Sequence, residues 1–308
     1  MKNNQSTKIG QSNQEEDDMN FSDPESEDED QDSSDDDLIS NNNSFLLQNM
    51  QSSSLLTTMR EAPKYIIPSS DFLKMQKDIT SQTRLAVVDW IFRVIDRVRY
   101  SREAFFNSVA ILDHMLASTT LTKQNIQLYA ATCLWMTAKL YETKNRELTI
   151  FTAVCRDQFK QEDFISTEMN IISALNGRIE YPTPQTFIRA LLIDTDLIDC
   201  EEMCNFFLDV SVTVNDFEEL PAHFVSAAAI IIGSAACDKF CPISKLMALI
   251  NCSCQTSLLK AAQALLNIAS SVVEKNLGGI FAFYAKDSPD RLSVAITKAT
   301  DYIHKAGI

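Results

Sequence analysis

The chain has 308 residues, a formal net charge of −15, and 45% hydrophobic residues. Residues 1–37 carry a net charge of −12, which leaves only −3 on residues 38–308. Because residues 38–308 have no excess of basic residues, we do not expect a positively charged surface that binds nucleic acid. Gly and Pro are scarce, at 6 and 8 residues, and apolar residues recur at helical spacing. We therefore predict an all-α protein that does not bind nucleic acid.

Residues 1–45 are predicted to form a disordered acidic tail. The run SDPESEDEDQDSSDDD repels itself and has almost nothing to bury. Four serines lie just before or among the acidic residues, in the setting that an acid-preferring kinase would use: Ser22, Ser26, Ser33 and Ser34. They are possible phosphorylation sites, and a tail that is never modified is equally consistent with the sequence.

Residues 46–80 are predicted to hold an N-terminal helix and a lead-in to the first domain. Leu55, Leu56 and Met59 lie on one side of a short amphipathic helix, which Pro63 ends.

Residues 81–181 are predicted to form a first domain of five helices. Their expected ranges are 81–98, 102–117, 122–142, 146–157 and 161–176. The first helix, TRLAVVDWIFRVIDRV, is apolar on nearly every side. Because such a helix must be surrounded by others, we expect it at the centre of its bundle.

A domain boundary is predicted at EYPTPQ, where two residues that precede prolines disfavour helix. A second domain, residues 182–285, should hold helices at 184–194, 199–214, 221–238, 242–250 and 256–276. Residues 286–308 are left as a C-terminal extension. Two successive blocks of about five helices indicate a structural duplication. The longest apolar run, 224–237, is shorter than the roughly 20 residues that cross a bilayer, so we expect a core helix and no membrane contact.

The eight cysteines are expected to be small buried hydrophobes in a reduced, intracellular protein, because the chain opens on a polar stretch rather than on a signal sequence. Cys200/Cys204 and Cys237/Cys241 have i, i+4 spacing, which leaves zinc as the alternative. The usual C-x-x-C spacing is absent and the chain has three histidines, so we predict no metal and no cofactor.

Polar residues inside apolar helices are the most informative part of the sequence. A buried Arg84 needs a carboxylate, and Asp113 in the next helix can supply it, although two independent surface charges remain the alternative. Lys139 and Glu168 also interrupt apolar stretches. They either pair with each other or stand as donor and acceptor for a docking element that rests on apolar neighbours, namely Met136, Leu140 and Ile172.

Five elements of the sequence, in order, resemble the cyclin family, and most closely the mitotic-type cell-cycle cyclins. TRLAVVDWIFRV is similar to MRAILVDWLVEV of that family, and FLKMQKDITSQ to its lead-in. TAKLYE resembles the A-x-K-x-x-E element, and STEMNIISALNGRIEYPTPQTFI the M-E-x-x-x-L…P-T segment. FLDVSVTVNDFEELPAHFVSAAAI resembles the segment with Leu-Pro followed by small residues.

The resemblance implies two tandem five-helix cyclin folds and a regulatory subunit that activates a cyclin-dependent Ser/Thr protein kinase without doing chemistry itself. It places the protein in the nucleus, the cytoplasm or both. A transcription-related cyclin and a transcription-factor-like cyclin-fold protein are the alternatives.

The resemblance also assigns roles to residues. Arg84 and Asp113 match an internal ion pair, and Lys139 and Glu168 match the pair that reaches the kinase. Further apolar kinase contacts are Leu55, Met136, Leu140, Ile172 and Ile179. A substrate-docking patch falls on Thr83, Ala86, Val87, Trp90, Arg93 and Gln127, with Leu128 as its associated core leucine. Because the floor of this patch is smaller than usual and Arg93 replaces an acid, we expect weak docking of basic, leucine-containing substrates.

Overall fold

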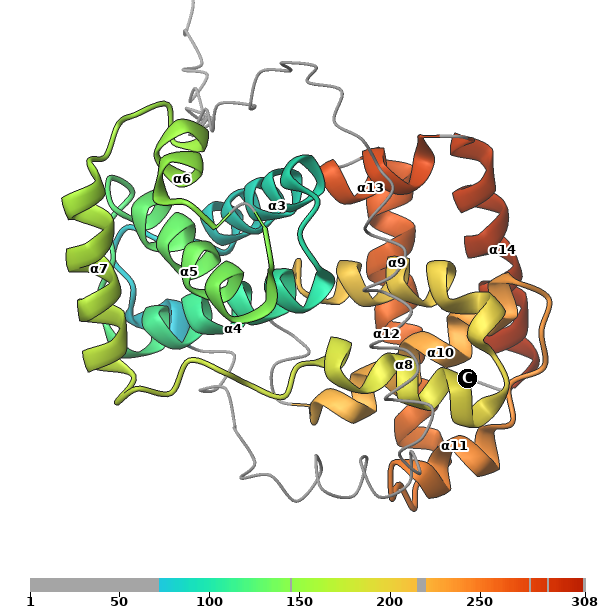
Figure 1. Ribbon diagram of the computed structural model, residues 1–308. Helices are drawn as coiled ribbons and strands as arrows, with labels where there is room; N and C mark the ends of the chain where they lie inside the picture. The colour runs from blue at the N-terminus through green and yellow to red at the C-terminus, as the bar shows by residue number, and fades with distance from the viewer. Residues whose placement is uncertain (1–71, 145, 215–219, 277, 287, 307–308) are drawn as a thin grey trace, which may run out of the picture.

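The computed structural model describes residues 72–144, 146–214, 220–276, 278–286 and 288–306. Within these ranges every regular element is a helix, which confirms the all-α prediction. Figure 1 shows the helices in two groups that lie side by side, α3–α7 and α8–α14. The predicted acidic tail with its four serines, and the predicted helix around Leu55, lie outside the described residues.

The first group has five α-helices preceded by a short 3-10 turn. The starts of α3 and α4 follow from their capping residues: the side chains of Thr80 and Ser101 accept hydrogen bonds from the backbone N–H groups of Thr83 and Ala104. The elements are η1 (Phe72–Met75), α3 (Ser81–Val98), α4 (Arg102–Ser118), α5 (Ile126–Tyr141), α6 (Leu148–Val154) and α7 (Gln161–Ala174).

The second group has seven α-helices. It contains α8 (Pro184–Thr195), η2 (Ile198–Cys200), α9 (Glu201–Ser211), α10 (Ala222–Ala236), α11 (Ile243–Leu249), α12 (Gln255–Glu274), α13 (Gly278–Ala285) and α14 (Pro289–Lys305). Each of the ten predicted helices begins and ends within five residues of an observed one. Helix α14 falls in the segment expected as an extension, yet it packs against α10 and α12. None of the described helices combines the length and apolarity that a membrane span requires.

The third helix of each group lies at its centre. Helix α5 packs against α3, α4, α6 and α7, and α10 packs against α8, α9, α11, α12 and α14. The expectation that α3 is central was therefore wrong. Helix α3 is apolar on nearly every side because α4 and α5 cover one part of it and α13, from the second group, covers another. Phe92 of α3 makes an edge-to-face contact with Phe283 of α13, with ring centroids 5.8 Å apart.

A buried polar cluster joins the two groups. Arg102 of α4 forms an ion pair with Asp209 of α9, and its Nη2 donates to the carbonyl of Asn205 at 3.1 Å. The hydroxyl of Tyr284 donates to Oδ2 of Asp209 at 2.9 Å. Asp209 is fully buried, so burial raises its pKa, while the charge of Arg102 opposes that rise. The cluster thereby holds α4 of the first group to α9 and α13 of the second.

The linker between the groups is fastened to α4. The side-chain amide of Asn107 donates to the carbonyl of Ile179 at 2.9 Å, and its oxygen accepts from the backbone N–H of Tyr181 at 3.1 Å. The ring of Tyr181 stacks on His114, with centroids 4.1 Å apart. Asn107 and His114 are both buried, so the linker has a fixed path.

The environment of His114 predicts a pH dependence of stability. Burial lowers the pKa of His114, and the bond to the Ala110 carbonyl and the charge of Asp113 oppose this only in part. In the unfolded chain the imidazole of His114 takes up a proton near pH 6.5, whereas in the folded protein it does so only at a lower pH. The free energy of unfolding should therefore fall as the pH drops from 7.5 to 5, and should fall less steeply in His114→Phe. Urea unfolding at each pH measures this, and parallel profiles for the two proteins would contradict it.

Candidate functional site

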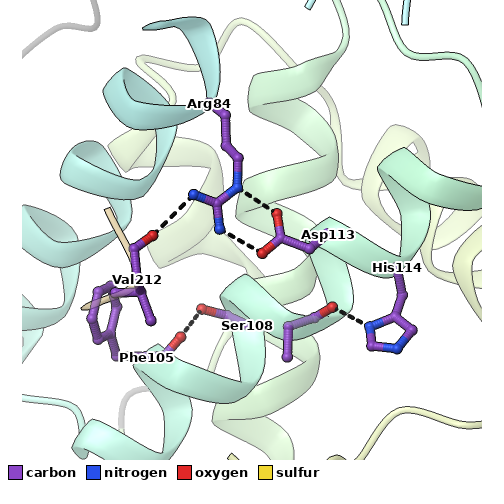
Figure 2. Close-up of polar contacts among 7 residues, drawn as sticks. Arg84, Phe105, Ser108, Asp113, His114 and Val212 are labelled. Carbon is purple, nitrogen blue, oxygen red and sulfur yellow. Dashed lines mark hydrogen bonds and ion pairs between the residues drawn. The ribbon is translucent and has the colours of Figure 1, made fainter. Parts of the chain in front are cut away.

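Arg84 and Asp113 are brought together as a buried, bidentate ion pair. Nε of Arg84 donates to Oδ1 of Asp113 at 2.7 Å, and Nη2 donates to Oδ2 at 2.6 Å. The two side chains are only 2% and 3% exposed. Figure 2 shows the remaining terminal nitrogen of the guanidinium turned toward the carbonyl of Val212, to which Nη1 donates at 2.9 Å. The pair therefore joins α3, α4 and the end of α9.

Lys139 and Glu168 also meet, but at the surface. Nζ of Lys139, in the last turn of α5, contacts Oε1 of Glu168 in α7. The side chains keep 37% and 20% of their exposure, and Nζ lies 3.6 Å from the centroid of the Trp135 ring. Of the two arrangements left open by the sequence, the structure contains the mutual pair. An exposed pair of this kind stabilises by only about 0–1 kcal/mol, so a partner can rearrange it at low cost.

Open apolar side chains surround this ion pair. Leu140 follows Lys139 and is 47% exposed, while Ile165 and Met169 flank Glu168 on α7 and are 52% and 63% exposed. Large side chains are seldom left this open in a cluster unless another surface covers them. We call Lys139, Leu140, Ile165, Glu168 and Met169 the α5–α7 surface.

Sequence reasoning missed Ile165 and Met169, although a signal was present. With Ile172 they have i, i+4, i+7 spacing, which forms a second apolar stripe on α7. The first stripe, represented by Phe164 and Ile171, is fully buried and holds α7 to the core. One buried stripe is enough to hold α7 to the core, so Ile165 and Met169 of the second stripe remain open to another surface.

Three other residues that were predicted to contact the kinase are less exposed than the apolar residues of the α5–α7 surface. Met136 is only 1% exposed and cannot supply a surface contact as it stands. It lies one turn before Leu140, where α5 is still covered by its neighbouring helices. Ile172 and Ile179 are half-buried at the edge of the core, and Leu55 lies outside the described residues.

The predicted substrate-docking patch is not an open apolar surface. Val87 and Trp90 are 0% and 2% exposed, because α3 is packed on several sides, α13 among them. Arg93 is exposed and pairs with Asp89 at 2.9 Å, and the carboxylate of Asp89 also accepts from the backbone N–H of Gly279 at 2.5 Å. Of the remaining positions, Thr83 is buried, and Ala86, Gln127 and Leu128 are half-buried.

A residue of the TAKLYE element has a structural role that sequence reasoning did not assign. Oε1 of Glu142 accepts from both the backbone N–H and the hydroxyl of Ser101, each at 2.7 Å. Ser101 in turn caps α4, so Glu142 fixes the end of α5 against the start of α4. In the described part of the chain, no group of three or more His, Cys, Asp or Glu side chains is arranged to hold a metal ion.

Comparison with protein families and curated proteins gives a consistent result. A family model described as "Cyclin, N-terminal domain" matches residues 54–180. The chain is 24% identical over 182 residues to G2/mitotic-specific cyclin-B of Emericella nidulans, a match that covers 59% of this chain and 38% of that protein. It is 30% identical over 132 residues to G2/mitotic-specific cyclin-B3 of Gallus gallus, with 42% and 32% covered. Each match spans well under half of the relative's length.

Among solved structures, a viral cyclin from Herpesvirus saimiri has a similar fold, with a TM-score of 0.63 and 18% identity. That similarity covers 75% of this chain and 99% of the viral one. A chain of the yeast RNA Pol II CTD kinase CTDK-1 complex is similar with a TM-score of 0.56 and 14% identity, with 73% and 82% covered. At these identities the likeness concerns the fold alone.

The buried ion pair predicts a strong asymmetry between single and double substitutions. Arg84→Met leaves the Asp113 carboxylate buried without its cation, so we expect the free energy of unfolding to fall by about 3–5 kcal/mol. In the double variant Arg84→Met/Asp113→Leu no charge is stranded, and part of the loss should be recovered. Urea unfolding measures both. Asp96→Asn, which breaks the exposed pair with Arg99, is the control and should cost less than about 1 kcal/mol.

Proposed function

Because this chain is a divergent member of the cyclin family, we propose that it is the regulatory subunit that binds and activates a cyclin-dependent Ser/Thr protein kinase. In this proposal the chain does no chemistry itself, and it acts in the nucleus, the cytoplasm or both. The observation that carries the proposal is the α5–α7 surface, where an exposed ion pair lies among three exposed apolar side chains.

The α5–α7 surface suits a partner that offers both backbone polar groups and apolar side chains. Lys139 can donate to carbonyl groups and Glu168 can accept from N–H groups of the docking segment. Covering the exposed halves of Leu140, Ile165 and Met169 contributes roughly 1 kcal/mol each, since each is already partly buried. A helix with an apolar face meets these requirements if one of its ends, where backbone groups are free, lies over the ion pair.

Activation follows from the rigidity of the platform. A protein kinase is active only when its Lys–Glu ion pair is formed and its activation loop is ordered. A fixed surface that binds this arrangement better than the inactive one shifts the kinase population toward it. Helices α5 and α7 pack against each other on a shared core, so the donor, the acceptor and the apolar side chains are held in place before binding.

We further propose that the kinase acts in cell-cycle progression. The names of the curated relatives, among them two G2/mitotic-specific cyclins, support this role over a transcriptional one. The near-neutral charge of residues 38–308 speaks against direct DNA binding by a transcription-factor-like protein. The identity of the recovered kinase separates the cell-cycle and transcriptional alternatives.

Substituting the ion pair of the α5–α7 surface should weaken kinase capture. The full chain with Lys139→Ala/Glu168→Ala is compared with wild type in pull-downs from the source cells, followed by mass spectrometry and affinity measurement with the recovered kinase. We expect at least tenfold weaker binding, or about 1.4 kcal/mol. The matched control is Glu202→Ala/Arg291→Ala, an exposed pair on the second group. Equal kinase recovery by all three proteins would mean that the α5–α7 surface is not the binding site.

The closed docking patch predicts weak recruitment of basic, leucine-containing peptides. With Val87 and Trp90 buried there is no apolar floor for a leucine, and the Arg93 guanidinium repels a basic peptide. Fluorescence anisotropy should show dissociation constants above about 100 μM. Arg93→Glu should strengthen binding less than tenfold, because the closed floor remains the main obstacle. Low-micromolar binding by the wild type would contradict this interpretation.

A further inference from the structure

Two helices of the second group, α9 and α10, approach each other closely beside a pair of cysteines. A Cβ built on Gly233 of α10 would lie 2.5 Å from Sγ and 2.8 Å from Cα of Cys204 in α9. Only glycine permits backbones to come this near. Cys200 lies one turn before Cys204, at the start of α9, and Cys237 lies one turn after Gly233, at the end of α10. The two thiols are close enough that each shifts the pKa of the other. The packing at Gly233 therefore sets these two cysteines at close range.

The two thiols differ in access. Cys200 is buried under the start of α9, whereas Cys237, at the end of α10, is half-exposed. We propose that Cys200 and Cys237 are a redox modification site that closes to a disulfide on exposure to hydrogen peroxide. A disulfide requires a short separation between the two Cα atoms, and the close approach of α9 and α10 at Gly233 brings this part of the two helices together.

The reaction balances with one peroxide molecule. The Cys237 sulfur attacks one peroxide oxygen, the O–O bond breaks, and the other oxygen leaves as water after taking up a proton. The Cys237 sulfenic acid that results is attacked by the sulfur of Cys200. The S–S bond forms, the S–O bond breaks, and the second oxygen also leaves as water. Two thiols are oxidised by two electrons, and hydrogen peroxide is reduced to two water molecules.

The surroundings decide which thiol attacks first. Burial raises the pKa of both thiols, that of Cys200 to about 12, so the pair rests in its protonated form. At Cys237 the hydrogen bond from Cys200 and the charges of Arg291 and Lys298 oppose the rise, with Glu202 acting the other way. Because Cys237 is also the more exposed of the two thiols, the proposal assigns it the attack on peroxide, and Cys200 resolves its sulfenic acid.

The disulfide would close a loop of residues 201–236. This loop includes α9, whose Asp209 pairs with Arg102 of the first helical group. Closing a loop of this length restricts the unfolded chain and stabilises the fold. Cys254 is the main competitor for peroxide, because it is exposed and a hydrogen bond from Ser257 lowers its pKa. All measurements are therefore made on the full chain with Cys254→Ser.

The test is non-reducing peptide mapping by mass spectrometry after treatment with hydrogen peroxide. We expect the Cys200–Cys237 cross-linked peptide as the main product. The melting temperature should rise by about 5–10 °C, and dithiothreitol should reverse the change. Cys237→Ser should abolish both effects, whereas Cys241→Ser, which removes a neighbouring buried thiol, should leave them intact. Circular dichroism of the reduced variants shows that each is folded.

Two results would overturn the proposal. One is a Cys200–Cys237 cross-link no more abundant in folded protein than in urea-denatured protein, since proximity in the fold would then contribute nothing. The other is oxidation of Cys237 to sulfinic acid without a cross-link, which would show that Cys200 cannot reach it.

Discussion

A guanidinium group buried in an apolar interior needs hydrogen-bond acceptors and a compensating negative charge, and Arg84 has both. Its fork is filled by the carboxylate of Asp113 and the carbonyl of Val212, so that one side chain ties the first helix to the second and to the end of α9. Each of these partners occupies a specific position, because an uncompensated buried charge costs several kcal/mol. The orientation of the two helical groups depends on this contact, and Arg102 with Asp209 repeats the same principle a short distance away.

The exposed ion pair of Lys139 and Glu168 has the opposite character. Its side chains remain in contact with water, so their attraction is weak and replaceable, and the apolar side chains beside them remain uncovered. In the proposed function, the protein uses one kind of ion pair to fix its shape and another to receive a partner. Burial makes the difference between them. An ion pair shielded from water is a fixed structural contact, whereas a solvent-exposed ion pair can exchange its partner.

Much of the fold could be predicted from the sequence, because helical periodicity, capping residues and prolines are local signals. Arg84 could be matched with Asp113 because charges inside apolar helices are rare. For Lys139 and Glu168 the sequence left open whether they pair with each other or serve a docking element. What could not be predicted depends on packing between distant segments. The burial of Met136 and Trp90, and the central position of α5 rather than α3, follow from neighbours that no local pattern identifies. Ile165 and Met169 were missed although their spacing with Ile172 was visible in the sequence.

Helix α13 lies across α3, almost two hundred residues from it along the chain. On the ribosome the first five helices emerge long before residues 278–285 are made. At about 5–20 residues per second, the gap from residue 181 amounts to roughly 5 to 20 s. Throughout that time Phe92 lacks its contact with Phe283, so an apolar face of α3 stays exposed on the nascent chain. Until α13 is made, this face of α3 is therefore available for non-specific association with other chains.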